Sequence, residues 1–158
     1  PLAQQADAIG LAGDTIEADI DGGFEWGHSG IEGEAAWAID EWSVPPAKQV
    51  TRLGAGPALT FRDRTSIADP QLVRLLIQEA EAAGLPWQWK HGTAGGNDAG
   101  AIQTQRGGVR VASLSLPCRY LHQPGNVLSV RDLEHGLELA RRGLHAWARE
   151  LSNGGDRR

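Results

Sequence analysis

Residues 109–116 read VRVASLSL, and this stretch decides the fold. It is nearly all apolar or small, which is typical of a strand buried on both faces of a sheet. Two further strand-like stretches precede it, PALTFR at 57–62 and LPWQWK at 85–90. In the first of them, the alternation predicts that Leu59 and Phe61 point inward. Together these stretches predict a sheet in which 109–116 is buried on both faces.

Helical patterns alternate with the strands. Asp69 followed by Pro70 predicts a helix start, because Asp caps helices and Pro fits the first helical position. Gly84 predicts the end of that helix. A second, shorter helix is expected at 98–106. The order of these elements predicts an α/β fold with a mostly parallel sheet and helices on both faces.

The longest predicted helix follows the last strand. It opens at Ser129, whose capping-box partner is Asp132. Asn153 and the glycines after it are expected to stop this helix. Its apolar stripe is expected to consist of Leu133, Leu137, Ala140, Leu144, Trp147 and Leu151.

The 158 residues fit one folding unit, but their composition changes along the chain. Residues 1–43 are acidic and rich in Gly and Trp, and they contain no Lys or Arg. Residues 44–152 carry the α/β pattern, and residues 153–158 are expected to be a frayed tail. Within the first stretch, 8–12 and 35–39 are each candidate strands.

Composition excludes several classes of protein. The net charge is −5, and no Lys/Arg stripe stands out before the C-terminus, so duplex nucleic acid is not expected as a partner. No stretch approaches the ~20 apolar residues of a membrane span. Cys118 is the single cysteine, which excludes an internal disulfide and favours a reducing, cytoplasmic location.

Two loops could carry chemistry, and both are expected at the carboxyl ends of the strands. The loop at 117–124 reads PCRYLHQP, and its His122 could bind zinc or cobalt or could bond only to the backbone. The glycine-rich loop at 92–100 could hold an anion on its amides, or Asp98 could simply cap the next helix. Spacing alone favours the structural interpretation of both loops.

Other candidate sites have weaker signals. Cys118 could pair with His122 as a nucleophile, but a buried thiol fits better. A divalent ion could be held by side chains of the acidic stretch, although a solvated loop is the simpler interpretation; these side chains are Glu25, His28, Glu32 and Glu34. A sugar platform could be built from tryptophans, although packing is the simpler interpretation; these are Trp26, Trp37, Trp42, Trp87 and Trp89.

Four ordered segments resemble one known family. They are LGAGPAL at 53–59, GGNDAGAIQTQRGGV at 95–109, SLSLPCRYLHQP at 113–124 and VRDLEHGLELARRGL at 130–144. Together, residues 44–150 are similar to the C-terminal part of the di-metal aminopeptidases called glutamyl or deblocking aminopeptidases. Some members of that family were once labelled cellulase M or endoglucanase.

The resemblance implies a function and a site. Members have an α/β/α sandwich, use two bridged divalent metals to release N-terminal residues from peptides, and often form large hollow homo-oligomers. By resemblance, His122 is a metal ligand for zinc or cobalt, and Gly95, Gly96 and Asn97 belong to the substrate-binding segment. A metal would lower the pKa of bound water and clamp the reacting oxygens.

The sequence also departs from the family. No stretch of 1–43 matches its His-x-Asp pair or its Glu-Glu pair, so no catalytic base is assigned. A further Asp ligand falls on Asp40 if AWAID at 36–40 is the matching strand, whereas strict register on GLAGDT at 10–15 gives Ala8 instead. We favour Asp40. Two ligands bind zinc weakly, since catalytic sites supply three.

Three hypotheses follow from this balance. The chain is a segment of a metal-dependent aminopeptidase, from a longer enzyme or a disrupted gene, and is active only if its site is completed. Alternatively, it is a non-catalytic assembly module. A glycan-cleaving role is the weakest hypothesis, because no carboxylate pair is evident. In each case the first stretch or a partner subunit is expected to cover the edge of the parallel sheet.

Overall fold

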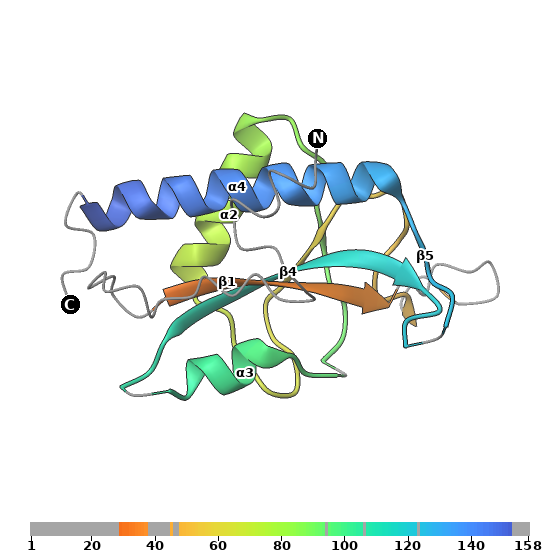
Figure 1. The fold of residues 1–158 in the computed structure, drawn as a ribbon, viewed down its shortest axis with the longest axis horizontal. Coiled ribbons are helices and arrows are strands. Elements are labelled where there is room, and N and C mark those ends of the chain that lie inside the picture. The colour runs from red at the N-terminus through yellow and green to blue at the C-terminus, as the bar shows by residue number, and fades with distance from the viewer. Residues whose placement is uncertain are drawn as a thin grey trace.

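The computed structural model describes residues 29–37, 45, 48–93, 95–105, 107–122 and 124–152, and for 29–37 it describes the backbone path. A single sheet with helices on both sides dominates the molecule (Figure 1). The strands are β1 (Ser29–Trp37), β2 (Ala58–Thr60), β3 (Gln88–Trp89), β4 (Arg110–Arg119) and β5 (Val127–Leu128). The helices are α2 (Pro70–Ala82), α3 (Asp98–Gln103) and α4 (Val130–Ser152).

The sheet is mixed rather than mostly parallel. Its order is β1-β4-β2-β3, and β5 pairs with β4. The pairs β1–β4 and β2–β3 are parallel, but β4 runs antiparallel to β2 and to β5. The α/β class is confirmed, and the parallel sense is correct for two of the four pairings. The reason is α3, whose six residues span only about 9 Å and do not return the chain across the sheet.

This topology also corrects the expectation that both candidate loops leave the same edge. Because β3 and β4 run in opposite directions, the loop after β3 and the loop after β4 leave the sheet at opposite edges. The carboxyl ends of β1 and β4 do share an edge, since Trp37 lies beside Cys118 in their register. β1 covers the edge of β4 along nine residue pairs, as expected for the first stretch.

Helices cover both faces of the sheet, as predicted. α2 and α4 lie together on one face, and α3 lies on the other (Figure 1). The side chains of β4 alternate between these layers. Leu114 joins the apolar core with Leu59, its partner on β2, whereas Ser113 is hydrogen-bonded to Asn97 at the start of α3. β4 is buried from Val111 to Ser115, as expected for a strand covered on both faces.

The start of α2 follows the predicted capping chemistry. The Asp69 carboxylate accepts hydrogen bonds from the backbone N–H groups of Gln71 and Leu72, and Pro70 is the first helical residue. Gly84 follows the helix in the left-handed conformation, with a φ of 64°. The buried side of α2 packs on α4 and the sheet through Leu72, Val73, Leu75, Leu76 and Ala80.

The buried stripe of α4 differs from the predicted one. Leu133, Leu137 and Leu144 are only half-buried, whereas the missed Leu139 is fully buried. Small residues explain the rotation, because they let the helix approach the sheet closely. A Cβ on Gly136 would come within 2.6 Å of Leu116 Cδ2. The buried residues of α4 are Asp132, Gly136, Leu139, Ala140, Gly143, Ala146 and Trp147.

The predicted inward position of Phe61 is wrong. β2 ends at Thr60, so the alternation stops there and the Phe61 side chain is 56% exposed. Trp87 and Trp89, which were expected on one face of a strand, do contact each other. Their rings meet edge to face with centroids 5.3 Å apart.

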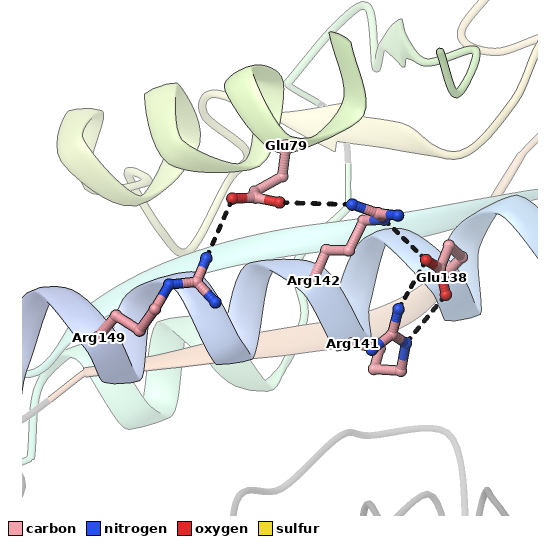
Figure 2. Close-up of polar contacts among 5 residues, drawn as sticks. All are labelled: Glu79, Glu138, Arg141, Arg142 and Arg149. Atoms are coloured by element: carbon pink, nitrogen blue, oxygen red, sulfur yellow. Dashed lines mark hydrogen bonds and ion pairs between the residues drawn. The ribbon is translucent and has the colours of Figure 1, made fainter. Parts of the chain in front are cut away.

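Ion pairs join the outer sides of α2 and α4 (Figure 2). Glu79 on α2 lies 3.5 Å from Arg149 and 4.0 Å from Arg142. Glu138 accepts two hydrogen bonds from Arg141 and one from Arg142, all on α4. These side chains are partly exposed, so the pairs tie the helices together without forming part of the core.

Over the residues that the structure describes, no helix combines the length and apolar character needed to span a bilayer.

Candidate functional site

His122 lies just beyond the shared carboxyl edge of β1 and β4. β4 ends at Arg119, and β5 turns back onto it through the pairs Cys118–Leu128 and Arg119–Val127. His122 is therefore in the turn of a short hairpin, and its side chain is exposed. It makes no hydrogen bond or ion pair with the described residues. None of the described residues therefore occupies its imidazole nitrogens.

The backbone around His122 is unusual. Tyr120 and His122 have φ values of 60° and 64°, and they are the two non-glycine residues with positive φ in the described part of the chain. Such conformations cost roughly 1–3 kcal/mol each, and they cluster at functional sites. The Tyr120 ring is 59% exposed, so it presents an aromatic surface beside the histidine. The hairpin therefore holds both residues in an uncommon backbone conformation.

The metal site expected from the sequence is not complete among the described residues. Among the described side chains, which belong to 45, 48–93, 95–105, 107–122 and 124–152, no three or more His, Cys, Asp or Glu come together to hold a metal ion. Asp40 lies outside the described residues, three positions after β1 ends. His122 is thus one possible ligand on the edge that β1 and β4 share, and a catalytic zinc needs more.

Cys118 does not pair with His122. The thiol is 95% buried, and its Sγ donates to the carbonyl oxygen of Arg119 at 3.3 Å. His122 is exposed in the turn and receives no hydrogen bond from Cys118. A buried thiol, which the sequence favoured over a nucleophile, agrees with this geometry.

The glycine loop packs against the segment after β2. The Gly95 carbonyl oxygen accepts a hydrogen bond from the Arg64 N–H at 2.9 Å. Gly96 has no room for a side chain, because a Cβ there would lie 2.4 Å from Thr65 Cγ2. The Asn97 N–H donates to Thr65 Oγ1 at 3.3 Å. The backbone N–H of Asn97 therefore already has a partner in the protein, which argues against the anion site considered for this loop.

The end of the glycine loop also differs from the prediction. Asn97, not Asp98, is the cap residue of α3, and its side chain makes no capping hydrogen bond. Its Nδ2 donates instead to Ser113 Oγ on β4 at 3.0 Å. The role of Gly95, Gly96 and Asn97 in binding substrate stays a prediction.

Two candidate clusters fall largely outside the described side chains. The possible ion site at Glu25, His28, Glu32 and Glu34 belongs to this group. So do Trp26, Trp37 and Trp42 of the proposed aromatic platform. Trp87 and Trp89 pack against each other, and Trp87 also packs on the hydrophobic core.

Sequence analysis did not predict the burial of two carboxylates. Asp132 was expected only as a capping partner of Ser129, but its oxygens accept from the N–H groups of Gly54 and Gly56 at 2.7 and 2.9 Å. Asp63 was not singled out at all. The signal that could have found it is the turn chemistry of an Asp followed by Thr65 and Ser66, whose backbone N–H groups donate to Asp63 Oδ1.

Several proteins that are similar to this chain are described as aminopeptidases or peptidases. The chain is 32% identical over 95 residues to the lysyl aminopeptidase of Pyrococcus furiosus, covering 60% of this chain and 27% of that one. An aminopeptidase structure from Desulfurococcus kamchatkensis superposes with a TM-score of 0.68 at 31% identity, covering 72% of this chain and 32% of that one. The Pyrococcus horikoshii TET1 peptidase, described as assembling into a tetrahedron or a large octahedral shell, gives 0.55 at 29%, covering 73% and 32%.

The family follows from a match along most of the chain. Residues 29–139 fit the family described as M42 glutamyl aminopeptidase, so the chain belongs to the M42 glutamyl aminopeptidase family. The match begins at β1, which lies upstream of the segment that carried the sequence resemblance. The chain spans 20–30% of the length of the curated relatives that it matches.

Proposed function

We propose that this chain contributes part of the catalytic domain of a metal-dependent aminopeptidase. In this proposal His122 and Asp40 are ligands of zinc or cobalt, and the remaining ligands and the general base come from outside the described residues. The substrate is the N-terminal end of a peptide. The location is cytoplasmic.

One observation carries the proposal. β1 and β4 are parallel neighbours with Trp37 beside Cys118, so the two strands end at the same edge of the sheet. His122 comes four residues after Cys118, and Asp40 comes three residues after Trp37 in the sequence. The exposure of His122 and its strained backbone support a ligand role at this edge. Membership of the M42 family supports the metal chemistry.

The second candidate is an assembly module without catalysis. It is favoured by the incomplete ligand set among the described residues and by the shell-forming TET1 relative. It predicts a homo-oligomer with no bound metal. An active member is also expected to be oligomeric, so oligomer mass alone does not separate the two candidates.

The test is metal content per chain after dialysis against zinc or cobalt, paired with hydrolysis of an aminoacyl-nitroanilide. Wild type is compared with His122→Ala and with His145→Ala, whose exposed histidine on α4 serves as the matched control. Metal binding with turnover, lost in His122→Ala and kept in His145→Ala, is the expected result. Equal metal binding in all three proteins would show that His122 is not a ligand.

A wild type without metal and without turnover contradicts the hydrolase proposal. If light scattering then shows a defined oligomer, the assembly module becomes the better description.

A further inference from the structure

Three buried oxygen atoms near the start of α3 have no hydrogen-bond partner among the described residues. They are Thr60 Oγ1, Asp63 Oδ2 and Asn97 Oδ1. Thr60 and Asp63 are only 2% and 3% exposed. Buried polar atoms are nearly always paired, so three unpaired acceptors in one region call for a physical reason.

The residues that carry these atoms are connected by contacts. Thr60 and Ser113 face each other in the antiparallel β2–β4 pair, so their side chains lie on the same face of the sheet. Asn97 reaches that face, because its Nδ2 donates to Ser113 Oγ at 3.0 Å. Thr65 Oγ1 accepts from the Asn97 N–H and donates to Asp63 Oδ1 at 3.1 Å. The end of β2, the start of α3 and the middle of β4 therefore enclose one polar cluster.

The cluster carries a negative charge that no cation of the described residues balances. Burial raises the pKa of Asp63, but hydrogen bonds from Thr65 and Ser66 outweigh that effect and hold the pKa below its ordinary value. The carboxyl group is therefore ionised at neutral pH. Among the described residues, no Lys, Arg or His forms an ion pair with it. A buried charge is costly unless it is paired.

We infer that Thr60, Asp63 and Asn97 form a buried site for one monovalent cation of the alkali or ammonium type. A carboxylate oxygen, an amide oxygen and a hydroxyl oxygen are hard donors, and hard cations select such oxygen ligands. The single carboxylate balances one positive charge. The site is separate from the edge that carries His122, because Ser113, the partner of Thr60, lies six residues before Arg119, where β4 ends.

The test compares thermal unfolding of the full chain in sodium, potassium, ammonium and choline chloride at equal ionic strength. Sodium, potassium or ammonium is expected to raise the midpoint by about 3 °C over choline, because a ligand that binds only the folded state stabilises it. In Asp63→Asn this difference is expected to vanish. The asparagine keeps the acceptor for Thr65 and Ser66, and its amide donates where the cation would bind.

Two further variants keep the test decisive. Asp132→Asn is the matched control, since Asp132 is equally buried but both of its oxygens accept backbone hydrogen bonds; its cation dependence should equal that of wild type. Thr60→Val removes one proposed ligand without changing shape and should reduce the shift. Equal midpoints of wild type in all four salts would overturn the inference, as would an undiminished shift in Asp63→Asn.

Discussion

The two faces of the sheet differ in the polarity of their buried side chains. Beneath α2 and α4, the inward side chains of β2 and β4 are Leu59 and Leu114, and they join a continuous apolar core. Beneath α3, the next residues along the same strands are Thr60 and Ser113, which are equally buried but polar. One face is thus held by nonspecific burial, and the other by hydrogen bonds that need particular partners.

The difference teaches where stability and specificity lie. Apolar burial contributes free energy in proportion to area and tolerates some repacking. A buried polar layer contributes little net free energy when its hydrogen bonds are complete, and it is costly when one is missing. We therefore expect the α2/α4 face to set the free energy of unfolding and the α3 face to fix local geometry.

The largest effect should come from truncating the apolar face. Leu59→Ala is expected to lower the free energy of unfolding by about 2–5 kcal/mol, because Leu59 is fully buried and a cavity would remain. Urea denaturation in choline chloride measures this change.

Its control is the adjacent residue on the other face. Thr60→Val in the same buffer should change the free energy of unfolding by less than about 1 kcal/mol, because the lost hydroxyl oxygen has no partner among the described residues. If Thr60→Val were as damaging as Leu59→Ala, the contrast between the faces would be wrong.

A smaller change in stability is expected at two closely packed glycines, Gly100 on α3 and Gly136 on α4, which lie on opposite faces of the sheet. Gly100→Ala would place a Cβ 2.5 Å from Thr65 Cβ and 2.9 Å from its carbonyl oxygen, with an expected cost of about 1–3 kcal/mol. Gly136→Ala meets only the tip of Leu116, which can rotate, and alanine favours the helix by up to about 1 kcal/mol.

Thermal unfolding of the two glycine variants gives their order. Gly100→Ala is expected to lower the unfolding midpoint more than Gly136→Ala. Thr65 cannot move away from the new Cβ, because hydrogen bonds with Asp63 and Asn97 fix it. A greater loss in Gly136→Ala than in Gly100→Ala would reverse that conclusion.

The smallest change in stability is expected from the partly exposed ion pairs of α4. Hydrogen bonds from Arg141 lower the pKa of Glu138 from 4.5 to about 2. Because the pKa is lower in the folded state, this stabilisation is present above about pH 4.5 and is lost as the pH falls toward 2. Glu138→Gln should cost less than about 1 kcal/mol at pH 7, since the side chain is 34% exposed.

Urea denaturation of wild type and Glu138→Gln at pH 7 and pH 3 checks this. The difference between the two proteins should shrink at the lower pH. A constant difference would mean that the carboxylate charge does not stabilise the folded state.

Local chemistry allowed much of the fold to be predicted. The Asp69–Pro70 start of α2 and the buried character of β4 depend on neighbouring residues, and both are confirmed. The direction of β4 could not be predicted in the same way, because it depends on how far α3 carries the chain. Asp132 illustrates the same limit: its hydrogen bond from the Asp132 N–H to Ser129 Oγ was expected, but the glycines bound by its carboxylate lie 76 and 78 positions away.

The candidate site was predictable only in part. His122 followed a buried strand in the sequence, and the structure places it in an exposed turn beyond that strand. Asp63 gave only a turn signal, because its sequence neighbours Thr65 and Ser66 do not reveal that its carboxylate is buried. Pairing of distant segments thus decides which polar residues become a site.

The pairing of β1 with β4 has a consequence for the order of folding. Their register joins Ser29 to Arg110, which lie 81 positions apart, and the strands between them belong to other pairs. Closing so long a loop costs entropy before any of its contacts form. β2, α2 and β3 need far shorter closures, so β1 is expected to dock late onto a nucleus that already holds β4. Until it docks, the long flank of β4 is open to any other strand.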